Sequence, residues 1–217
     1  MNQFIRSGRS RVIWASLAGL LLLFSADVRG DNSQNGVVAA AFQPFATLLE
    51  GYLVEKPLEN DGLVSAFDYR AALDNPDTKE ILDDQRRRLA GFDISSLDTR
   101  EKAIAFWNNA YNFFMIYQIL TKRVDGKIVG SVWDYGGRYS PFKSSVFERD
   151  RFTVGGKNYS LNDMEKGMLL GDDFKSKGWK DARVHFTVNC ASFCNDTATT
   201  EIYTSGNIGA MMTENTR

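Results

Sequence analysis

One segment constrains the fold of this chain more than any other: about Thr99–Lys122, which is apolar on nearly every side of a helix. One side carries Ile104, Trp107, Tyr111, Phe114, Met115 and Gln118, and the remainder carries Phe106, Phe113, Ile116 and Ile119. Asp98 and Glu101 resemble a capping box that opens this helix. A helix that is apolar all round has to be enclosed by other elements, so we expect it at the centre of one core.

The elements predicted around this helix mix helices with strands. Spacing, turn and capping residues predict a helix after Pro44, a helix from Asn75-Pro76 to about Leu89, a hairpin around Gly155-Gly156, and a helix opened by Ser160 and Asp163 that ends near Gly171. No strand–helix–strand rhythm is present. We therefore predict a single α+β domain in which the central buried helix packs against a small, mainly antiparallel sheet.

A last strand is predicted over Asp181–Asn189, where apolar and polar residues alternate. Val184, Phe186 and Val188 would face one way. The opposite face would carry Arg183, His185, Thr187 and Asn189, spaced about 6.6 Å apart. This polar face is either the solvated side of an edge strand or part of a functional site.

Asparagines interrupt the apolar helix, and two of them stand out by their spacing. Asn109 and Asn112 are three residues apart and therefore neighbours on one face. Asparagine is a poor helix former, and burying its amide unpaired costs about 1–3 kcal/mol. Their side chains are expected either to bond to the backbone of adjacent loops or to line a pocket.

Composition excludes several classes of function. One histidine and two cysteines cannot build a three-histidine zinc site, a four-cysteine cluster or a disulfide scaffold, so we expect no metal. A formal net charge of −1 does not indicate the excess of basic residues that is typical of proteins binding nucleic acid. No glycine-rich nucleotide-binding motif occurs between a strand and a helix, and we expect no cofactor.

The first thirty residues are typical of a cleaved signal peptide. Arg6, Arg9 and Arg11 precede an apolar run, Val12–Phe24, and small residues then suit cleavage after Gly30. The alternative is an uncleaved anchor, but 13 apolar residues fall short of the roughly 20 that cross a bilayer. The sequence thus predicts a periplasmic or secreted protein with no stable membrane anchor after cleavage.

Three motifs resemble one known family. The run of residues 106–112, FWNNAYN, resembles the FWxNAYN motif of the domain of unknown function 547 family. Residues 152–165 are similar to its FTVGG hairpin and L-x-D-I-E helix start, and residues 181–192 to its D-x-R-x-H-F-x-x-x-C-A-S strand. The motifs keep the family's order over about residues 42–193. The family has no established activity, and its members are common as secreted bacterial proteins.

The resemblance also indicates candidate site residues and ends abruptly. It singles out Trp107, Asn109, Tyr111, Asn112, Glu165, Arg183, His185 and Cys190. The family continues CASxSCPPL, whereas this chain has a cysteine at position 194 and no prolines after it. We predict a domain over residues 31–193 that is truncated, followed by an unstructured or artefactual tail, residues 194–217, in which Cys194 is not the family's second cysteine.

Three functions remain open from the sequence. Cys190 would be the nucleophile and His185 the base of a hydrolase or transferase, although a continuous strand would separate the two residues by about 16 Å. Against this stands a purely structural interpretation, with Cys190 as a small buried residue and His185 hydrogen-bonded within the fold. Alternatively, the protein would be a non-catalytic binding module for a small molecule, glycan or peptide of the cell envelope. Its pocket would be formed by Trp107, Asn109, Tyr111, Asn112, Glu165, Arg183 and Asn189. The third is a thiol redox function of Cys190 and Cys194, although these cysteines lack the C-x-x-C spacing of thioredoxin-like sites.

Overall fold

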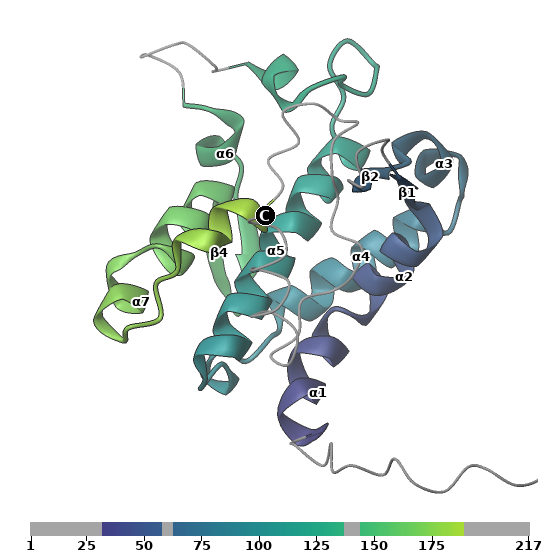
Figure 1. Ribbon diagram of the computed structural model, residues 1–217. Coiled ribbons are helices and arrows are strands. Elements are labelled where there is room, and N and C mark those ends of the chain that lie inside the picture. Colours follow the sequence, from purple (N-terminus) through teal and green to yellow (C-terminus); the bar gives the residue numbers. More distant parts are fainter. Residues whose placement is uncertain (1–31, 58–62, 137–143, 189–217) are drawn as a thin grey trace, which may run out of the picture. The chain divides into compact units, whose positions relative to one another are not determined.

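The computed structural model describes residues 32–57, 63–136 and 144–188 (Figure 1). The predicted signal peptide, Asn189, both cysteines and the predicted tail lie outside these described residues. The described elements follow in the order α1 (Asn32–Ala41), α2 (Gln43–Tyr52), β1 (Leu53–Pro57), β2 (Leu63–Phe67), α3 (Tyr69–Asp74), α4 (Thr78–Ala90), η1 (Ile94–Ser96), α5 (Arg100–Thr121), η2 (Val132–Tyr135), α6 (Val146–Arg149), β3 (Phe152–Val154), β4 (Lys157–Tyr159), η3 (Asp163–Leu169), α7 (Asp172–Ser176) and η4 (Ala182–Phe186).

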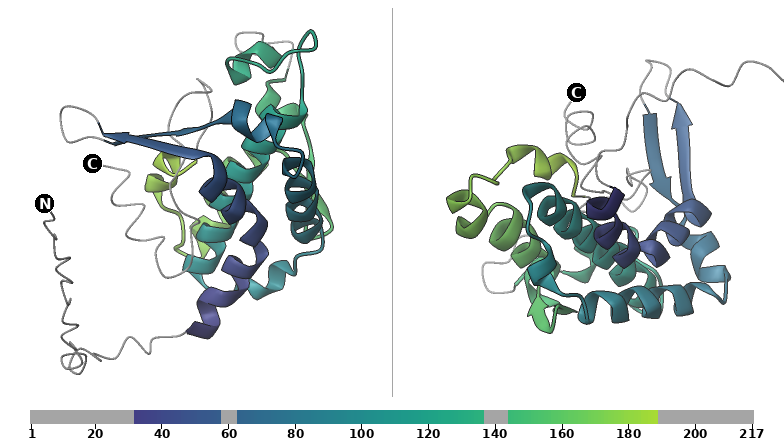
Figure 2. Two further views of the ribbon diagram at one scale, coloured as in Figure 1. Left: turned by 90° about the vertical axis from the view of Figure 1, so that its right-hand side faces the viewer. Right: turned by 90° about the horizontal axis from the view of Figure 1, so that it is seen from below.

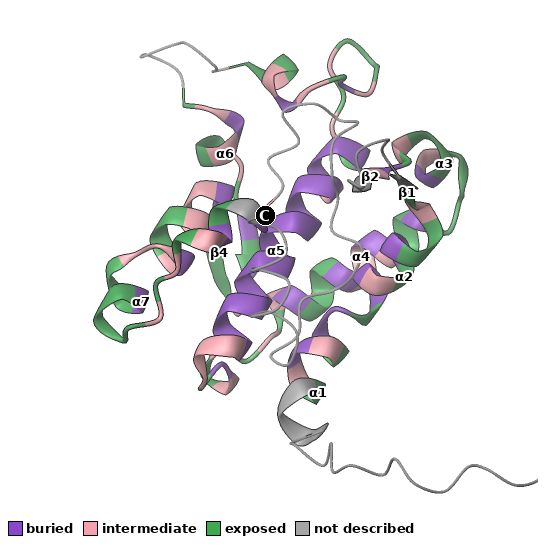
Figure 3. Ribbon diagram, viewed as in Figure 1, coloured by how far each residue is buried: buried purple, intermediate pink, exposed green. Residues whose placement is uncertain are grey.

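Helix α5 is the predicted central helix, and it is buried along almost its whole length (Figure 3). Its N-cap lies one residue later than the predicted capping box: the Thr99 hydroxyl accepts from the backbone N–H of Lys102 at 3.3 Å. Asp98 instead accepts from the Lys102 ammonium at 2.8 Å. The cap is therefore shifted by one residue, while the helix and its central position are confirmed.

Aromatic rings tie α5 to its neighbours. Phe106 contacts Phe42 edge-on with ring centroids 5.3 Å apart. Phe114 stacks on Phe152 of β3 at 4.4 Å. These contacts pack α5 against both the N-terminal helices and the β3–β4 hairpin, which confirms the predicted α+β domain.

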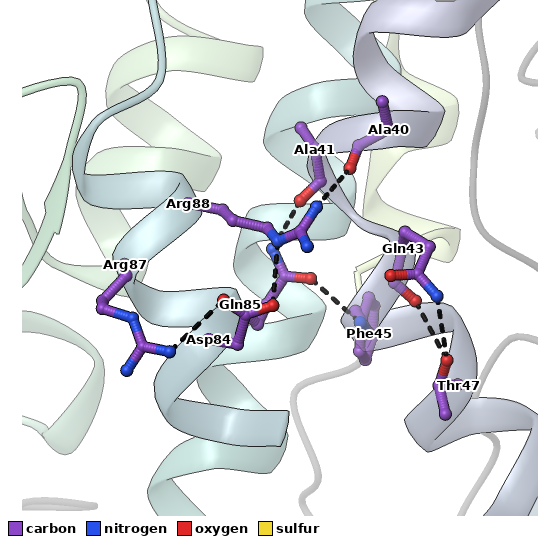
Figure 4. A network of polar contacts seen from close by, with 9 residues as sticks. All are labelled: Ala40, Ala41, Gln43, Phe45, Thr47, Asp84, Gln85, Arg87 and Arg88. Atoms are coloured by element: carbon purple, nitrogen blue, oxygen red, sulfur yellow. Dashed lines mark hydrogen bonds and ion pairs between the residues drawn. The ribbon is translucent and has the colours of Figure 1, made fainter. Parts of the chain in front are cut away.

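Helix α2 and helix α4 match the two helices predicted from apolar spacing. They are joined by the buried side chain of Gln85 on α4 (Figure 4). Its oxygen accepts from the backbone N–H of Phe45, and its nitrogen donates to the Ala41 carbonyl, each at 2.9 Å. Gly91 forms the C-cap of α4, close to the predicted end of this helix at Leu89. The amide of Gln85 thus satisfies backbone groups at the junction of α1 and α2.

The predicted glycine hairpin is confirmed, and a second hairpin was not predicted. Strands β3 and β4 are antiparallel around Gly155-Gly156, and the two glycine N–H groups donate to Leu89 and Ala90 carbonyls at 2.9 Å. Gly155 has φ +54°, and a Cβ there would lie 2.4 Å from Ile94 Cγ1. Strands β1 and β2 form a separate antiparallel pair (Figure 2).

The strand predicted over Asp181–Asn189 is wrong for its described part, which forms the 3₁₀ helix η4. The Asp181 side chain accepts from the backbone N–H of Arg183 at 3.0 Å, which starts a helical turn. Val184 and Thr187, three residues apart, are both buried and share one side of such a turn. This i, i+3 spacing coexists with the alternation that favoured a strand.

Within residues 32–57, 63–136 and 144–188, no helix is both long and apolar enough to cross a membrane.

Candidate functional site

Glu165 lies on a wide helical turn. The predicted capping box is confirmed: the Ser160 N–H donates to Asp163 Oδ2 at 2.9 Å, and the Asp163 N–H donates to Ser160 Oγ at 3.0 Å. The helix that follows, η3, is a π-helix, a rare conformation that is frequent at functional sites. Met164 is buried, while the Glu165 side chain is 19% exposed. The π-helix therefore holds a carboxylate at the protein surface.

The chain's single histidine lies beside that carboxylate. His185 Nδ1 lies 2.9 Å from Glu165 Oε1, and 53% of the histidine side chain is exposed. A carboxylate beside Nδ1 favours a proton on that nitrogen, and in the neutral ring this tautomer leaves Nε2 as the acceptor. Nε2 has no hydrogen-bond partner among the described residues. A carboxylate-oriented imidazole with an open Nε2 is the arrangement of a general base.

Two asparagines of α5 hold the chain just after His185. Asn112 Nδ2 donates to the Thr187 carbonyl at 2.9 Å. The Thr187 hydroxyl lies 2.7 Å from Asn108 Oδ1 and 2.9 Å from the Val184 carbonyl. All three side chains are buried. We call Asn108, Asn112 and Thr187 the Thr187 clamp.

A half-buried carboxylate fixes the other end of η4. Asp181 Oδ2 lies 2.7 Å from Nη2 of both Arg183 and Arg100, the first residue of α5. Hydrogen bonds from the Arg183 side chain and backbone, the charge of Arg183 and the hydrogen bond from Arg100 outweigh the effect of burial and lower the pKa of Asp181 to about 2. The same carboxylate raises the pKa of Arg183. Helix η4 is therefore attached to α5 at both ends.

The structure brings together only some of the predicted site residues. It places Glu165 beside His185 and puts Asn112 and Arg183 at the two attachments of η4. Trp107, Asn109 and Tyr111 are buried on α5, each at 1% exposure, and Trp107 packs edge-on against Tyr159 at 4.9 Å. For Asn112, the expectation of a bond to loop backbone is confirmed.

Sequence reasoning missed one member of this arrangement. Asn108 is not among the predicted site residues, whereas Asn109 is. Asn108 and Asn112 are nevertheless four residues apart and therefore also share a helix face. That spacing was the available signal. Its partner Thr187 lies 79 residues later, so the sequence did not show which asparagine would be used.

A family profile described as Protein of unknown function, DUF547, matches residues 94–217. The chain belongs to this family. The DUF547 match begins at Ile94 rather than near residue 42, and it includes residues 194–217, for which the sequence predicts an unstructured or artefactual tail. All three motifs, and every residue of the site described above, lie within the match. No curated protein and no solved structure matches the chain.

Among the described residues of this DUF547 protein, no group of three or more histidine, cysteine, aspartate or glutamate side chains is placed to hold a metal ion. Glu165 and His185 together supply one anionic oxygen acceptor and one open imidazole nitrogen. This pair is equipped to accept a proton at Nε2 and to stabilise the resulting imidazolium through Glu165.

Proposed function

We propose that this protein is a cysteine-dependent hydrolase or transferase, in which Cys190 is the nucleophile, His185 the general base and Glu165 the residue that orients the base. The contact between His185 Nδ1 and Glu165 Oε1 at 2.9 Å supports the proposal most directly, because a carboxylate beside Nδ1 favours the tautomer that a base requires. No other histidine in the chain is available for this role.

The 3₁₀ conformation of η4 removes an objection to this pairing. A continuous strand would separate residues 185 and 190 by about 16 Å. The described chain from Ala182 to Phe186 is instead helical, with a rise of about 2 Å per residue. The residue spacing of an extended strand, on which the 16 Å separation depends, therefore does not apply to this part of the chain.

The proposed reaction is acyl transfer. Cys190 Sγ attacks the carbonyl carbon of an amide or ester, and its proton passes to His185 Nε2. When the carbon–heteroatom bond breaks, the leaving group takes that proton from Nε2, and an acyl-thioester remains on Cys190. Water or another acceptor then attacks the thioester carbon and loses a proton to Nε2. The carbon–sulfur bond breaks, the acyl product leaves, and Cys190 Sγ takes that proton from Nε2, which regenerates the thiol.

The setting we propose is the periplasm or the extracellular space. The basic and apolar segments before Gly30 support export and cleavage. The substrate would accordingly be a small molecule, peptide or acylated glycan of the cell envelope, and a nucleic acid is not expected at a formal charge of −1.

Trapping the acyl-enzyme tests this function. The full chain is incubated with a panel of activated acyl esters, and the mass of intact protein and of its peptides is followed over time. We expect a transient acyl adduct on Cys190 that disappears on longer incubation. The rate of acylation is expected to fall by about 10²-fold or more in His185→Gln, the range of a lost general base, and also to fall in Glu165→Gln.

The second cysteine provides the matched control. Cys194→Ser keeps Cys190 and should acylate like the wild type, whereas Cys190→Ala should form no adduct. Equal acylation of Cys190 and Cys194, or acylation unaffected by His185→Gln, would contradict the proposal. Binding of an envelope ligand that survives Cys190→Ala, without any acyl adduct in the wild type, would instead support a binding module.

A further inference from the structure

The Thr187 clamp has a hydrogen-bond pattern that is sensitive to geometry. Asn108 Nδ2 donates to the Ile104 carbonyl of its own helix at 2.9 Å, which orients the amide and turns Oδ1 toward Thr187. The Thr187 hydroxyl carries one proton and faces two acceptors, Asn108 Oδ1 and the Val184 carbonyl. The Thr187 carbonyl accepts from Asn112. Side chain and backbone of one residue are therefore fixed at the same time.

The buried position of the clamp makes it costly unless it has a specific role. Asn108 is fully buried and Asn112 is 5% exposed, within a helix whose neighbouring positions are apolar. Apolar side chains there would favour the helix and avoid the cost of desolvating two amides. The three groups nevertheless satisfy one another within the described structure.

The clamp acts two residues from His185. Thr187 is the C-cap of η4, and its backbone N–H donates to the Val184 carbonyl at 3.0 Å, which closes the turn containing His185. His185 is itself exposed and has one side-chain contact among the described residues, the contact to Glu165. Its ring position consequently depends on how the backbone of η4 is held.

We propose that Asn108, Asn112 and Thr187 are positioning residues, which hold η4 on α5 so that His185 Nδ1 stays in contact with Glu165. This role deepens the proposed function, because the tautomer of His185 matters chemically only if His185 is the base. None of the three residues needs to contact the substrate. The geometry of the base is set from the buried core rather than from the surface.

The single histidine makes the test direct. Nitrogen NMR of the full chain with labelled imidazole, recorded at mildly alkaline pH, reports one side chain. In the wild type we expect mostly the tautomer protonated at Nδ1. Thr187→Val keeps the shape but loses the hydroxyl, and we expect the Nδ1-protonated tautomer to become the minor form. Thr187→Ser keeps the hydroxyl and should restore the wild-type spectrum.

Each result decides the role. A wild-type tautomer in Thr187→Val, or the same loss in Thr187→Ser, would overturn it, because packing rather than the hydrogen bond would then set the ring. If Thr187→Val does not fold, Asn112→Ala is the deciding variant, and a wild-type tautomer there would overturn the role. Failure of both to fold would also overturn it, since the contacts would then serve only folding. The spectrum requires no turnover, so it can succeed or fail independently of acylation at Cys190.

Discussion

Nδ1 of His185 lies 2.9 Å from Oε1 of Glu165, although the two residues belong to helical turns of different kinds, the 3₁₀ helix η4 and the π-helix η3. Both turns have their own backbone anchors: a capping box at Ser160 for η3 and a capping aspartate, Asp181, for η4. The His185–Glu165 pair therefore forms between two segments, each of which is fixed by its own local hydrogen bonds.

Two buried glutamines should respond oppositely to the same substitution. Both amide atoms of Gln118 are buried and have no hydrogen-bond partner among the described residues, so Gln118→Met should raise the free energy of unfolding by about 1 kcal/mol. Gln85 bonds to Phe45 and Ala41, so Gln85→Met should lower it by about 2–3 kcal/mol. Urea unfolding measures both, and a loss of stability in Gln118→Met would contradict the account.

Gly171 should tolerate no side chain at the end of η3. A Cβ there would lie 1.9 Å from the Gly167 carbonyl oxygen, so Gly171→Ala has to displace backbone and should cost about 1–3 kcal/mol. At Gly167 the nearest atom to an added Cβ lies 3.8 Å away, and Gly167→Ala should be neutral or stabilise by about 0.4–1 kcal/mol. Thermal unfolding of the two variants should separate them, and equal melting temperatures would refute this geometry.

Asp181 should give the protein an acid-sensitive component of stability. Its folded pKa is about 2, below about 3.9 in unfolded chains, so the stabilisation is present above pH 4 and is lost as the pH falls towards 2. Allowing for solvent screening, Asp181→Asn should cost about 1–2 kcal/mol at neutral pH.

Comparison of two pH values isolates this contribution. The difference in unfolding free energy between the wild type and Asp181→Asn should shrink from pH 7 to pH 2. Asp74→Asn is a suitable control, because Asp74 is exposed and has no hydrogen bond or ion pair within the described structure. A difference that stays constant with pH would show that Asp181 does not act through its charge.

The sequence predicted elements whose cause is local. The apolar surface of α5 required burial whatever lay around it, and Gly155-Gly156 required a turn. The strand at Asp181–Asn189 failed because a two-residue alternation and the i, i+3 spacing of Val184 and Thr187 occur in the same residues. Hairpin β1–β2 was not predicted, because its strands show no clean alternation of polar and apolar residues and β1 ends at a proline, Pro57.

The candidate site was predictable by residue type but not by contact. His185 and Glu165 stand in motifs of the family, yet their pairing depends on the backbone of two irregular helices. Asn108 and Thr187 lie 79 residues apart, and only packing of η4 on α5 brings them together. Long-range polar pairs of this kind have no periodicity to detect.

The pH dependence of alkylation at Cys190 tests the central claim most directly. The full chain is treated with iodoacetamide across a pH series, and modification of each cysteine is measured by mass spectrometry. A nucleophile paired with His185 should react through a thiolate formed well below the usual pH of about 8.5, and His185→Gln should return its midpoint to about 8.5. A Cys190 midpoint at about 8.5 in the wild type, the same as that of Cys194 and unchanged by His185→Gln, would contradict the account.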